Sequence, residues 1–600
     1  MCGIAGDLSF TSNPSSVEAL MRMSDCLSPR GPDGKGLVFR GSAGLAHRRL
    51  KIIDLSEAGR QPMEDAELGL TLVFNGCIYN HRELRGELEG KGYRFFSTSD
   101  SEVILKGFHA WGTKVVDRLN GMFAFAIVER DSGRVTLARD RLGIKPLYLA
   151  DTPDGLRFAS SLPALLASGD DIDRTIDPVA LHHYFSFHAV VPPPRTLFAG
   201  VRKLPPATVL EIEPDGQRRE QHYWSPHYAP RDDETSLSDT DWRERIEAAL
   251  RASVKRRLVA DVPVGVLLSG GLDSSLIVAL LAEAGATGLN TFSIGFETVG
   301  EEKGDEFEYS DIVADAFGTT HHKIPVETSQ ALPALSGAIQ AMSEPMTSHD
   351  CVGFYLLSQE VSKHVKVVQS GQGADEVFAG YHWYPPMDGA NDAFDTYAQS
   401  FFDRDHAEMG DVLHAAHIGE DHAAAYVRAH FEEAGAIDAV NKALRIDTHV
   451  MLVDDPVKRV DNMTMAWGLE ARVPFLDHEL VELAARCPAR LKLAEDGKGI
   501  LKTIARDHVP HAVIDRPKGY FPVPALKYLR GPYLEMVRDA VTSSAFRDRG
   551  LIQPGYIDQL LADPEGQITR LRGSKLWQVG VLALWLAEHD APARARARAA

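Results

Sequence analysis

A cysteine stands directly after the initiator methionine, and it is the first residue whose position suggests chemistry. If Met1 is removed, Cys2 carries a thiol and an α-amine on one residue. The reference pKa of an α-amine is about 7.7–8.0, so this amine can act as the general base for its own side chain. The position therefore predicts an N-terminal nucleophile. Taken alone, a cysteine at position 2 is more often an ordinary residue.

A glycine-rich segment in the second half, Ser269-Gly-Gly-Leu-Asp-Ser-Ser275, is the second candidate site. It stands between an apolar run and a helical pattern, so its backbone N–H groups can converge on an anion at a helix N-terminus. No GxxxxGK[ST] spacing occurs anywhere, which excludes a Walker A loop. The SGGxDS motif resembles the nucleotide loop of enzymes that split ATP into AMP and pyrophosphate. A random glycine-rich turn is the alternative, and the flanking strand and helix patterns disfavour it.

The residues around Cys2 are predicted to be rich in strands. Short β-type runs before about residue 210 are separated by Gly, Asn and Asp. Three examples are 70–74, 122–128 and 135–138. A polar stretch without an apolar period follows near 225–240, which suits a linker between two domains.

The second half alternates buried strands with helices. Its strand candidates are 262–268, 291–296 and 365–370. Helical spacing is found over 242–258, from about Leu272, and over most of 391–588. This alternation predicts a doubly wound parallel sheet with helical additions.

Length and charge limit the classes of protein to which the chain can belong. Its 600 residues exceed one ordinary core, so two or more domains are expected. Lys and Arg number 64 against 84 Asp and Glu, and the formal charge of -20 makes nucleic acid a poor partner. The five cysteines form no CxxC pair, and no apolar stretch is long enough for a membrane span. We therefore expect a cytoplasmic protein with reduced thiols that binds neither nucleic acid nor membrane.

Five motifs in the first half resemble, in this order, the glutaminase domain of the asparagine synthetase B family. They are Arg30-Gly-Pro-Asp33, His47-Arg-Arg-Leu50, Phe74-Asn-Gly-Cys-Ile-Tyr-Asn80, Ser99-Asp-Ser-Glu102 and Arg139-Asp-Arg-Leu-Gly-Ile-Lys-Pro-Leu-Tyr148. The resemblance implies an N-terminal-nucleophile (Ntn) hydrolase, an αββα sandwich that hydrolyses glutamine at Cys2. Turns and surface ion pairs would explain each motif singly, but not five in one order.

The family's glutamine-site positions transfer to this chain residue by residue. Hydrolysis of a side-chain amide passes through an oxyanion, for which Asn75 and Gly76 match the family's hydrogen-bond donors. Arg49 matches the cation that holds the glutamine carboxylate, and Asp100 matches the anion that holds its ammonium. The family usually has Glu where this chain has Cys77, so Asp100 is expected to carry more of the ammonium recognition. Packing as a small apolar residue is the preferred interpretation of Cys77 itself.

The second half resembles the synthetase domain of the same family, an ATP pyrophosphatase (PP-loop) fold. The motifs include Thr291-Phe-Ser-Ile-Gly-Phe296, Ser370-Gly-Gln-Gly-Ala-Asp-Glu-Val-Phe378, Glu470-Ala-Arg-Val-Pro-Phe-Leu-Asp477 and Arg516-Pro-Lys-Gly519. The resemblance implies that ATP is bound by Leu268, Ser269, Gly270, Gly271, Asp273, Ser274, Ile294, Ser370 and Gly371. It also implies that Asp273 and Asp375 hold Mg²⁺, because a hard cation beside a triphosphate takes oxygen ligands. Lys518 would neutralise charge that grows between the substrate carboxylate and the α-phosphate.

Together the two halves predict a ligase that takes ammonia from glutamine and converts a small carboxylate into an amide. The resemblance implies an interdomain tunnel for the ammonia. The family usually has Glu where this chain has Gln372, which can orient ammonia only by hydrogen bonding.

Three hypotheses about the reaction follow from the motifs. Gln372, Cys77 and the segment 344–351 together resemble the pattern of the N-acetylglutaminylglutamine amidotransferase branch of the family. The resemblance implies that the preferred acceptor is the C-terminal carboxylate of that dipeptide. Aspartate, which would give asparagine, is the alternative. A glutaminase or non-catalytic relative with a vestigial second half is a hypothesis of a different class. The intact Ser269–Ser275 loop argues against it.

The predicted domain boundaries follow from these assignments. We expect a glutaminase domain over 1–215, a linker over 216–240, a synthetase domain over 241–590 and a flexible tail over 591–600. The sequence leaves open whether the chain forms a homodimer.

Overall fold

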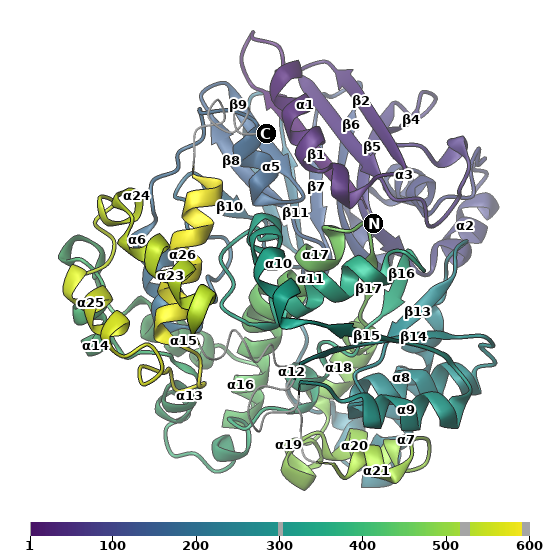
Figure 1. Ribbon diagram of the computed structural model, residues 1–600. Helices are drawn as coiled ribbons and strands as arrows, with labels where there is room; N and C mark the ends of the chain where they lie inside the picture. Colours follow the sequence, from purple (N-terminus) through teal and green to yellow (C-terminus); the bar gives the residue numbers. More distant parts are fainter. Residues whose placement is uncertain (1, 298–303, 517–528, 591–600) are drawn as a thin grey trace.

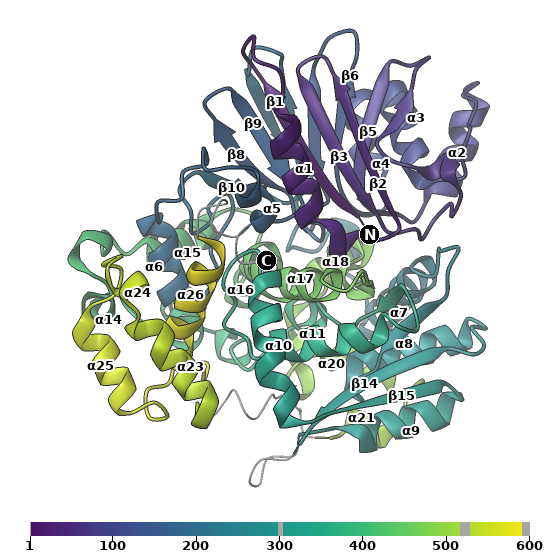
Figure 2. The same cartoon turned by 45° about the horizontal axis from the view of Figure 1, so that its top comes forward.

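The structure is a computed structural model that describes residues 2–297, 304–516 and 529–590. Two six-stranded antiparallel sheets lie in the N-terminal half, and a five-stranded parallel sheet lies in the C-terminal half (Figure 1). In both views the N-terminal sheets stand above the parallel sheet, and the last helices of the chain, among them α23 (Gly531–Thr542) and α26 (Lys575–His589), lie to one side (Figure 2). Within the described ranges, no helix is long and apolar enough to cross a membrane.

The first antiparallel sheet contains β1, the strand that follows Cys2. Its order is β10 (Val201–Lys203), β8 (Tyr148–Thr152), β9 (Gly155–Ala159), β1 (Gly3–Ser9), β3 (Ala43–Arg49) and β2 (Gly34–Arg40). The second sheet has the order β12 (Arg218–His222), β11 (Thr208–Ile212), β7 (Val135–Arg139), β6 (Gly121–Glu129), β5 (Leu70–Ile78) and β4 (Met63–Asp65). Because β1 and β3 contact β5 across the two layers, Cys2 lies next to the end of β5.

The two sheets pack face to face, and helices cover their outer faces. The inner layer includes Ile4, Leu45 and Val73, which are fully buried. Successive side chains of a strand point to opposite faces, so Ala5 of β1 packs outward. It lies in a cluster that also contains residues of α1 (Val17–Cys26) and α5 (Leu162–Ala167). The helices α2 (His81–Gly90) and α3 (Asp100–Trp111) cover the second sheet, which completes the predicted αββα Ntn-type sandwich.

The parallel sheet is buried on both faces. Its order is β15 (Thr320–Val326), β14 (Asn290–Phe296), β13 (Val264–Leu267), β16 (Val367–Gln369) and β17 (Glu470–Arg472). Val266 of β13 packs in one cluster with residues of α7 (Asp239–Arg256) and α8 (Leu272–Glu283). Leu267 packs on the other face with residues of α11 (Asp350–Val361). Helices on both faces of a parallel sheet are typical of a doubly wound fold, as predicted.

Most of the predicted elements are present. The strand predictions at 70–74, 122–128 and 135–138 correspond to β5, β6 and β7. Those at 262–268, 291–296 and 365–370 correspond to β13, β14 and β16. The strands β13 and β16 are shorter than their apolar runs. The helix predicted over 242–258 is α7, and the one expected from Leu272 is α8.

Two segments cross the expected domain boundaries. The strand β12 lies inside the expected linker 216–240, yet it pairs with β11 and forms the edge of the second sheet. The helix α6 (Pro178–Ser186) belongs by sequence to the first half. It nevertheless packs against α14 (His406–Val412) and α15 (His422–Glu432) of the second half (Figure 1). These contacts are long-range in sequence, so the apolar pattern along the chain does not reveal them.

Buried ion pairs join the two halves. Arg30 Nη1 lies 2.8 Å from Asp461 Oδ2, and Lys145 Nζ lies 3.3 Å from Asp461 Oδ1. Lys203 Nζ lies 2.9 Å from Glu344 Oε2. Removing one member of such a buried pair leaves a buried charge without its partner, which is strongly destabilising. The pairs therefore fix the arrangement of the halves.

Candidate functional site

Cys2 and Asn75 meet where β1 begins and β5 nears its end. The backbone nitrogen of Cys2 donates a hydrogen bond to Asn75 Oδ1 at 3.0 Å, and both residues are buried. With Oδ1 held in this way, Asn75 Nδ2 has no hydrogen-bond acceptor among the described residues. A buried donor without an acceptor costs free energy unless a ligand or water supplies one. Asn75 Nδ2 is therefore a free donor close to Cys2, as an oxyanion site requires.

Gly76 must be glycine for a steric reason. A Cβ atom at this position would lie 2.1 Å from the backbone oxygen of Met122 on the neighbouring strand β6. Gly76 also lines the pocket beside Cys2. The predicted oxyanion residues are thus adjacent on β5, one with a free side-chain donor and one with its backbone at the pocket wall.

Arg49 and Asp100 supply opposite charges to the same pocket. The guanidinium of Arg49 donates to the backbone oxygens of Ser56, at 2.9 Å, and Asp54. No carboxylate of the described residues lies within ion-pair distance of it, so a substrate carboxylate can take that place. Asp100 begins α3, and its Oδ2 accepts a hydrogen bond from the backbone nitrogen of Ile78 at 3.0 Å. Burial raises the pKa of Asp100, so an ammonium partner would stabilise its charged form.

Cys77 contacts the C-terminal half of the chain. Arg472 Nη2 donates to Cys77 Sγ at 3.5 Å, and Arg472 Nε donates to Glu470 Oε1 at 2.6 Å. Burial raises the pKa of the Cys77 thiol well above its usual value, so the thiol is protonated. Cys77 also packs in an apolar cluster with Tyr79 and Met122. This packing agrees with the interpretation preferred from the sequence.

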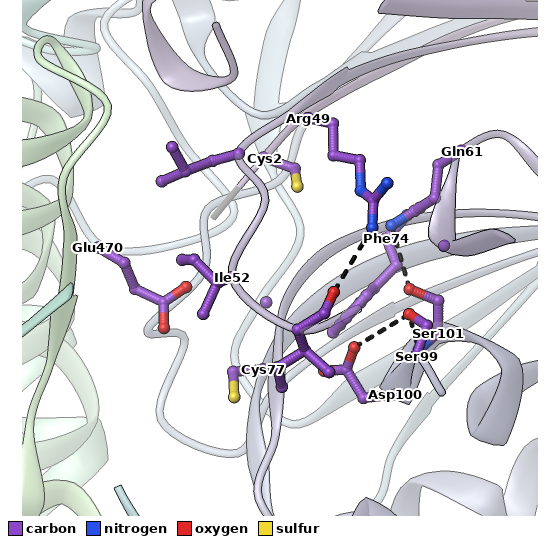
Figure 3. A pocket seen from close by; sticks show the side chains of 14 residues that line it. Cys2, Arg49, Ile52, Gln61, Phe74, Cys77, Ser99, Asp100, Ser101 and Glu470 are labelled. Atoms are coloured by element: carbon purple, nitrogen blue, oxygen red, sulfur yellow. Dashed lines mark hydrogen bonds between the residues drawn. The ribbon is translucent and has the colours of Figure 1, made fainter. Parts of the chain in front are cut away.

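The pocket at Cys2 is small, and both halves of the chain line it. Its volume is about 30 Å³, and Arg49, Cys77 and Asp100 are among its lining residues. Figure 3 shows Glu470 reaching this pocket from the ribbon of the C-terminal half, on the side away from Arg49 and Asp100. The volume would hold a few water molecules, so a substrate must displace side chains or water to enter.

The predicted nucleotide loop joins β13 to α8. Gly270 has a φ of +70°, and a Cβ atom there would lie 2.6 Å from the backbone nitrogen of Ser310. Ser274 Oγ accepts a hydrogen bond from the backbone nitrogen of Ser269 at 3.2 Å, which folds the loop onto the first turn of the helix. Backbone N–H groups in such a loop favour an anion.

A pocket of about 740 Å³ opens beside this loop, where the parallel strands end. Open α/β sheets bind ligands at that edge. The predicted ATP-binding residues that line it are Leu268, Ser269, Gly271, Asp273, Ser274, Ile294, Ser370 and Gly371. Gly270 is not part of the lining and instead shapes the loop. Asp375 and Gln372 line the same pocket, so the structure brings these ten second-half candidates together.

Asp273 and Asp375 share one cation. Lys498 Nζ lies 2.7 Å from Asp273 Oδ2 and 2.9 Å from Asp375 Oδ2. Burial lowers the pKa of Lys498, but the two carboxylates outweigh it and raise the pKa above its usual value. The position between the two carboxylates therefore favours a positive charge. Carboxylate oxygens are also the ligands that the predicted Mg²⁺ prefers.

Lys518, the predicted charge-neutralising residue, lies outside the described residues. The neighbouring Arg516 is described, and its guanidinium lies 2.8 Å from Glu306 Oε1. Arg516 is also 4.4 Å from the centre of the Tyr309 ring. Both Arg516 and Glu306 line the large pocket, so the motif that contains Lys518 begins at the nucleotide site.

Lys498 and the position of Glu470 at the first pocket were not predicted from the sequence. Lys498 stands between Gly497 and Gly499 and has a φ of +55°. A lysine between two glycines just before a helix was the available signal. Glu470 was noted only as part of a motif. No local pattern indicated that it lines the first pocket, because the chain brings it there across the domain interface.

Comparisons with known proteins agree with this arrangement of two sites. Residues 1–224 match the family described as glutamine amidotransferase domain, and residues 245–587 match the family described as asparagine synthase. Asparagine synthetase (glutamine-hydrolyzing) 1 of Bacillus subtilis (strain 168) is 32% identical over 98% of this chain and 96% of that protein. Asparagine synthetase B (glutamine-hydrolyzing) of Escherichia coli (strain K12) is 30% identical over 87% of this chain and 82% of that protein.

These matches support a glutamine-hydrolysing amidotransferase of the asparagine synthetase type. They give no support to the dipeptide branch that the motifs favoured. By the extent of both matches, the chain belongs to the asparagine synthase family of ATP-dependent ligases.

Proposed function

We propose that the protein moves the amide nitrogen of glutamine to a small carboxylate through the interior of one chain. The observation that carries this proposal is the position of β17. Glu470, its first residue, lines the pocket at Cys2. The backbone oxygen of Arg472, its last residue, accepts a hydrogen bond at 2.8 Å from the backbone nitrogen of Ser370, which lines the nucleotide pocket. A single three-residue strand thus reaches both sites, which supports a short internal route for ammonia.

The glutamine half of the reaction is proposed to begin at Cys2. Burial raises the pKa of its thiol, so the thiol needs a base to become a nucleophile. The α-amine that is exposed when Met1 is removed would accept that proton. Asn75 Nδ2 and the backbone N–H of Gly76 would then stabilise the oxyanion.

The α-carboxylate and the α-ammonium of glutamine are also proposed to have partners in the pocket at Cys2. Arg49, which has no carboxylate partner among the described residues, would bind the α-carboxylate of glutamine. Asp100 would bind the α-ammonium, without help from a carboxylate at position 77. A hydrogen bond between charged groups is about twice as strong as one between neutral groups, so Cys77 is expected to cost the protein some glutamine affinity.

In the second half, the residues around the loop are proposed to bind ATP. When bound at Asp273 and Asp375, Mg²⁺ would neutralise phosphate charge and orient the triphosphate. The backbone N–H groups of the Ser269–Ser275 loop would bind phosphate oxygens. Lys498 would remain beside the two carboxylates and add a positive charge at the phosphates. Lys518 keeps the role that the resemblance implies, namely neutralising charge at the reacting carboxylate.

Aspartate is the first candidate acceptor, because the matched relatives are named asparagine synthetases. N-acetylglutaminylglutamine is the second candidate, and Gln372 favours it. This residue lines the large pocket with a neutral amide, which offers both a donor and an acceptor for a peptide group.

The experiment offers each acceptor to the purified chain with ATP, Mg²⁺ and glutamine. Pyrophosphate release and the mass of the amide product are measured. Asparagine alone would exclude the dipeptide, and the dipeptide amide alone would exclude aspartate. Glutamate release without any amide product would contradict the proposal and leave the glutaminase hypothesis. The Gln372→Glu variant is the matched control, because the Glu side chain has nearly the same shape as that of Gln. It is expected to weaken amide formation on the dipeptide only.

A further inference from the structure

A cluster of histidine and aspartate lies far from both pockets in the fold and joins the two halves of the chain. His182 lies on α6, His406 is the first residue of α14, and Asp421 caps α15. One ligand atom from each residue lies within 4.8 Å of the other two. None of the three lines the pocket at Cys2 or the nucleotide pocket, so the reaction described above does not use them.

Ser186 contacts the ring nitrogen of His182 that faces away from His406. Ser186 Oγ donates its hydrogen to the backbone oxygen of His182 at 2.7 Å. The same Oγ lies 3.3 Å from His182 Nδ1, where it can only accept. In the tautomer that has its proton on Nδ1, this contact is a hydrogen bond from His182 to Ser186, and Nε2 carries the lone pair that an ion needs. Metal-binding histidines are held in this way, with one nitrogen donating to a neighbour and the other facing the ion.

The distances suit a tetrahedral ion. His182 Nε2 lies 3.2 Å from His406 Nδ1. Two nitrogens bound to one zinc ion at 2.0–2.1 Å in tetrahedral geometry would lie about 3.3–3.4 Å apart. Asp421 accepts a hydrogen bond from the backbone nitrogen of Ala424 through Oδ1, at 3.1 Å, and a carboxylate keeps further lone pairs for an ion.

The cluster also has the ligand types that a metal site needs. His182 is fully buried and contributes an imidazole ring, and Asp421 contributes a carboxylate. Neutral imidazole and carboxylate are the ligands that zinc and similar divalent ions take. His406 and Asp421 are partly exposed, which leaves a path for an ion and a place for water.

We propose that His182, His406 and Asp421 bind a zinc ion that ties α6 of the first half to α14 and α15 of the second. The ion would have three protein ligands and one water molecule. Its role would be structural, since it would hold α6, a helix of the glutaminase half, against α14 and α15 of the other half.

The test titrates Zn²⁺ into the full chain, purified with a chelator and without a histidine tag, and follows binding by competition with a chromophoric chelator. One site per chain is expected, together with a rise in melting temperature that grows with free Zn²⁺. His406→Ala and Asp421→Asn are each expected to weaken that site by about a hundredfold. Asn caps a helix as well as Asp does, so Asp421→Asn removes the charge and keeps α15.

The matched control is His417→Ala, which removes a histidine from the segment between α14 and α15 outside the cluster. It is expected to bind Zn²⁺ like the unchanged chain. The proposal is overturned if the unchanged chain binds no Zn²⁺, or if His406→Ala and Asp421→Asn bind it as tightly as His417→Ala. In either case the contact between His182 and His406 is only a hydrogen bond.

Discussion

The two pockets differ in size and in how they hold their charges. The pocket at Cys2 has a volume of about 30 Å³, and the pocket at the nucleotide loop has one of about 740 Å³. In the first, backbone oxygens rather than a carboxylate hold Arg49. In the second, Lys498 pairs with Asp273 and Asp375. The first pocket therefore has a cation without a carboxylate partner among the described residues, whereas the charges of the second are paired with one another.

This difference between the pockets predicts which substitutions should remove which activity. The small pocket depends on a few atoms in fixed positions, so loss of its nucleophile should remove one activity and leave the other. The large pocket depends on the balance of several charges, so loss of its central cation should remove synthesis from any nitrogen source.

Cys2→Ala is expected to abolish glutamine-dependent amide synthesis. The other thiol that lines the small pocket, Cys77, has no α-amine of its own to act as a base. Synthesis from added ammonia should persist, since the nucleotide pocket is unchanged. Pyrophosphate release with glutamine or with ammonium chloride is the measurement. The matched control is Cys77→Ala, which removes the other thiol of this pocket and should keep both activities. Equal loss of both activities in Cys2→Ala would contradict the separation of the sites.

Lys498→Met is expected to lower amide synthesis from glutamine and from ammonia alike, by about a hundredfold. The variant leaves Asp273 and Asp375 close together without their shared cation. Hydrolysis of glutamine, measured as glutamate release, should persist. Lys502→Met, which changes another lysine of the same pocket, is the control and should have a smaller effect. Full ammonia-dependent synthesis in Lys498→Met would show that the charge balance does not matter.

Arg472→Met is expected to lower the free energy of unfolding by about 3–5 kcal/mol, because it removes a buried partner of Glu470. It also removes a donor to the backbone oxygens of Arg257 and Val259, each at 2.8 Å. Urea denaturation followed by fluorescence measures the change. Arg490→Met breaks an exposed ion pair with Asp239 and should cost less than about 1 kcal/mol. Similar losses in the two variants would argue against a special role for the interface at β17.

Acid is expected to destabilise the region around the small pocket through His47. Burial lowers the pKa of His47 to about 3, below the value of about 6.5 in an unfolded chain. Its contribution to stability is therefore complete above pH 6.5 and is lost as the pH falls toward 3. The urea midpoint should fall between pH 7.5 and pH 5. In His47→Gln it should fall less, and an equal fall would remove His47 from the explanation.

Much of the site could be predicted from the sequence because its motifs are local. Asn75 and Gly76 are neighbours on one strand, and the Ser269–Ser275 loop is a single turn between a strand and a helix. Asp273 and Asp375 were paired through the family resemblance, and the strands that precede them, β13 and β16, lie side by side in the parallel sheet. The free Nδ2 of Asn75 was not predictable, since it results from the hydrogen bond between the sheets that holds Oδ1.

The remaining features depend on contacts between distant segments. Glu470 lines the small pocket only because β17 lies at the edge of the parallel sheet nearest to it. The helix α6 packs with α14 and α15 although more than two hundred residues separate them in sequence. No periodicity within 178–186 indicates that partner. Such contacts depend on how the two halves of the chain pack together. The apolar pattern within one segment does not predict that packing.

The measurement that tests the central claim most directly follows one nitrogen atom. Glutamine labelled with ¹⁵N in its amide group is supplied with ATP, Mg²⁺ and an acceptor, in the presence of excess unlabelled ammonium. We predict that the amide product carries ¹⁵N far above the ratio in solution, because ammonia passes from Cys2 to the nucleotide pocket inside the protein. A product labelled only to the solution ratio would contradict the internal route, and no amide product with either acceptor would contradict the proposed function.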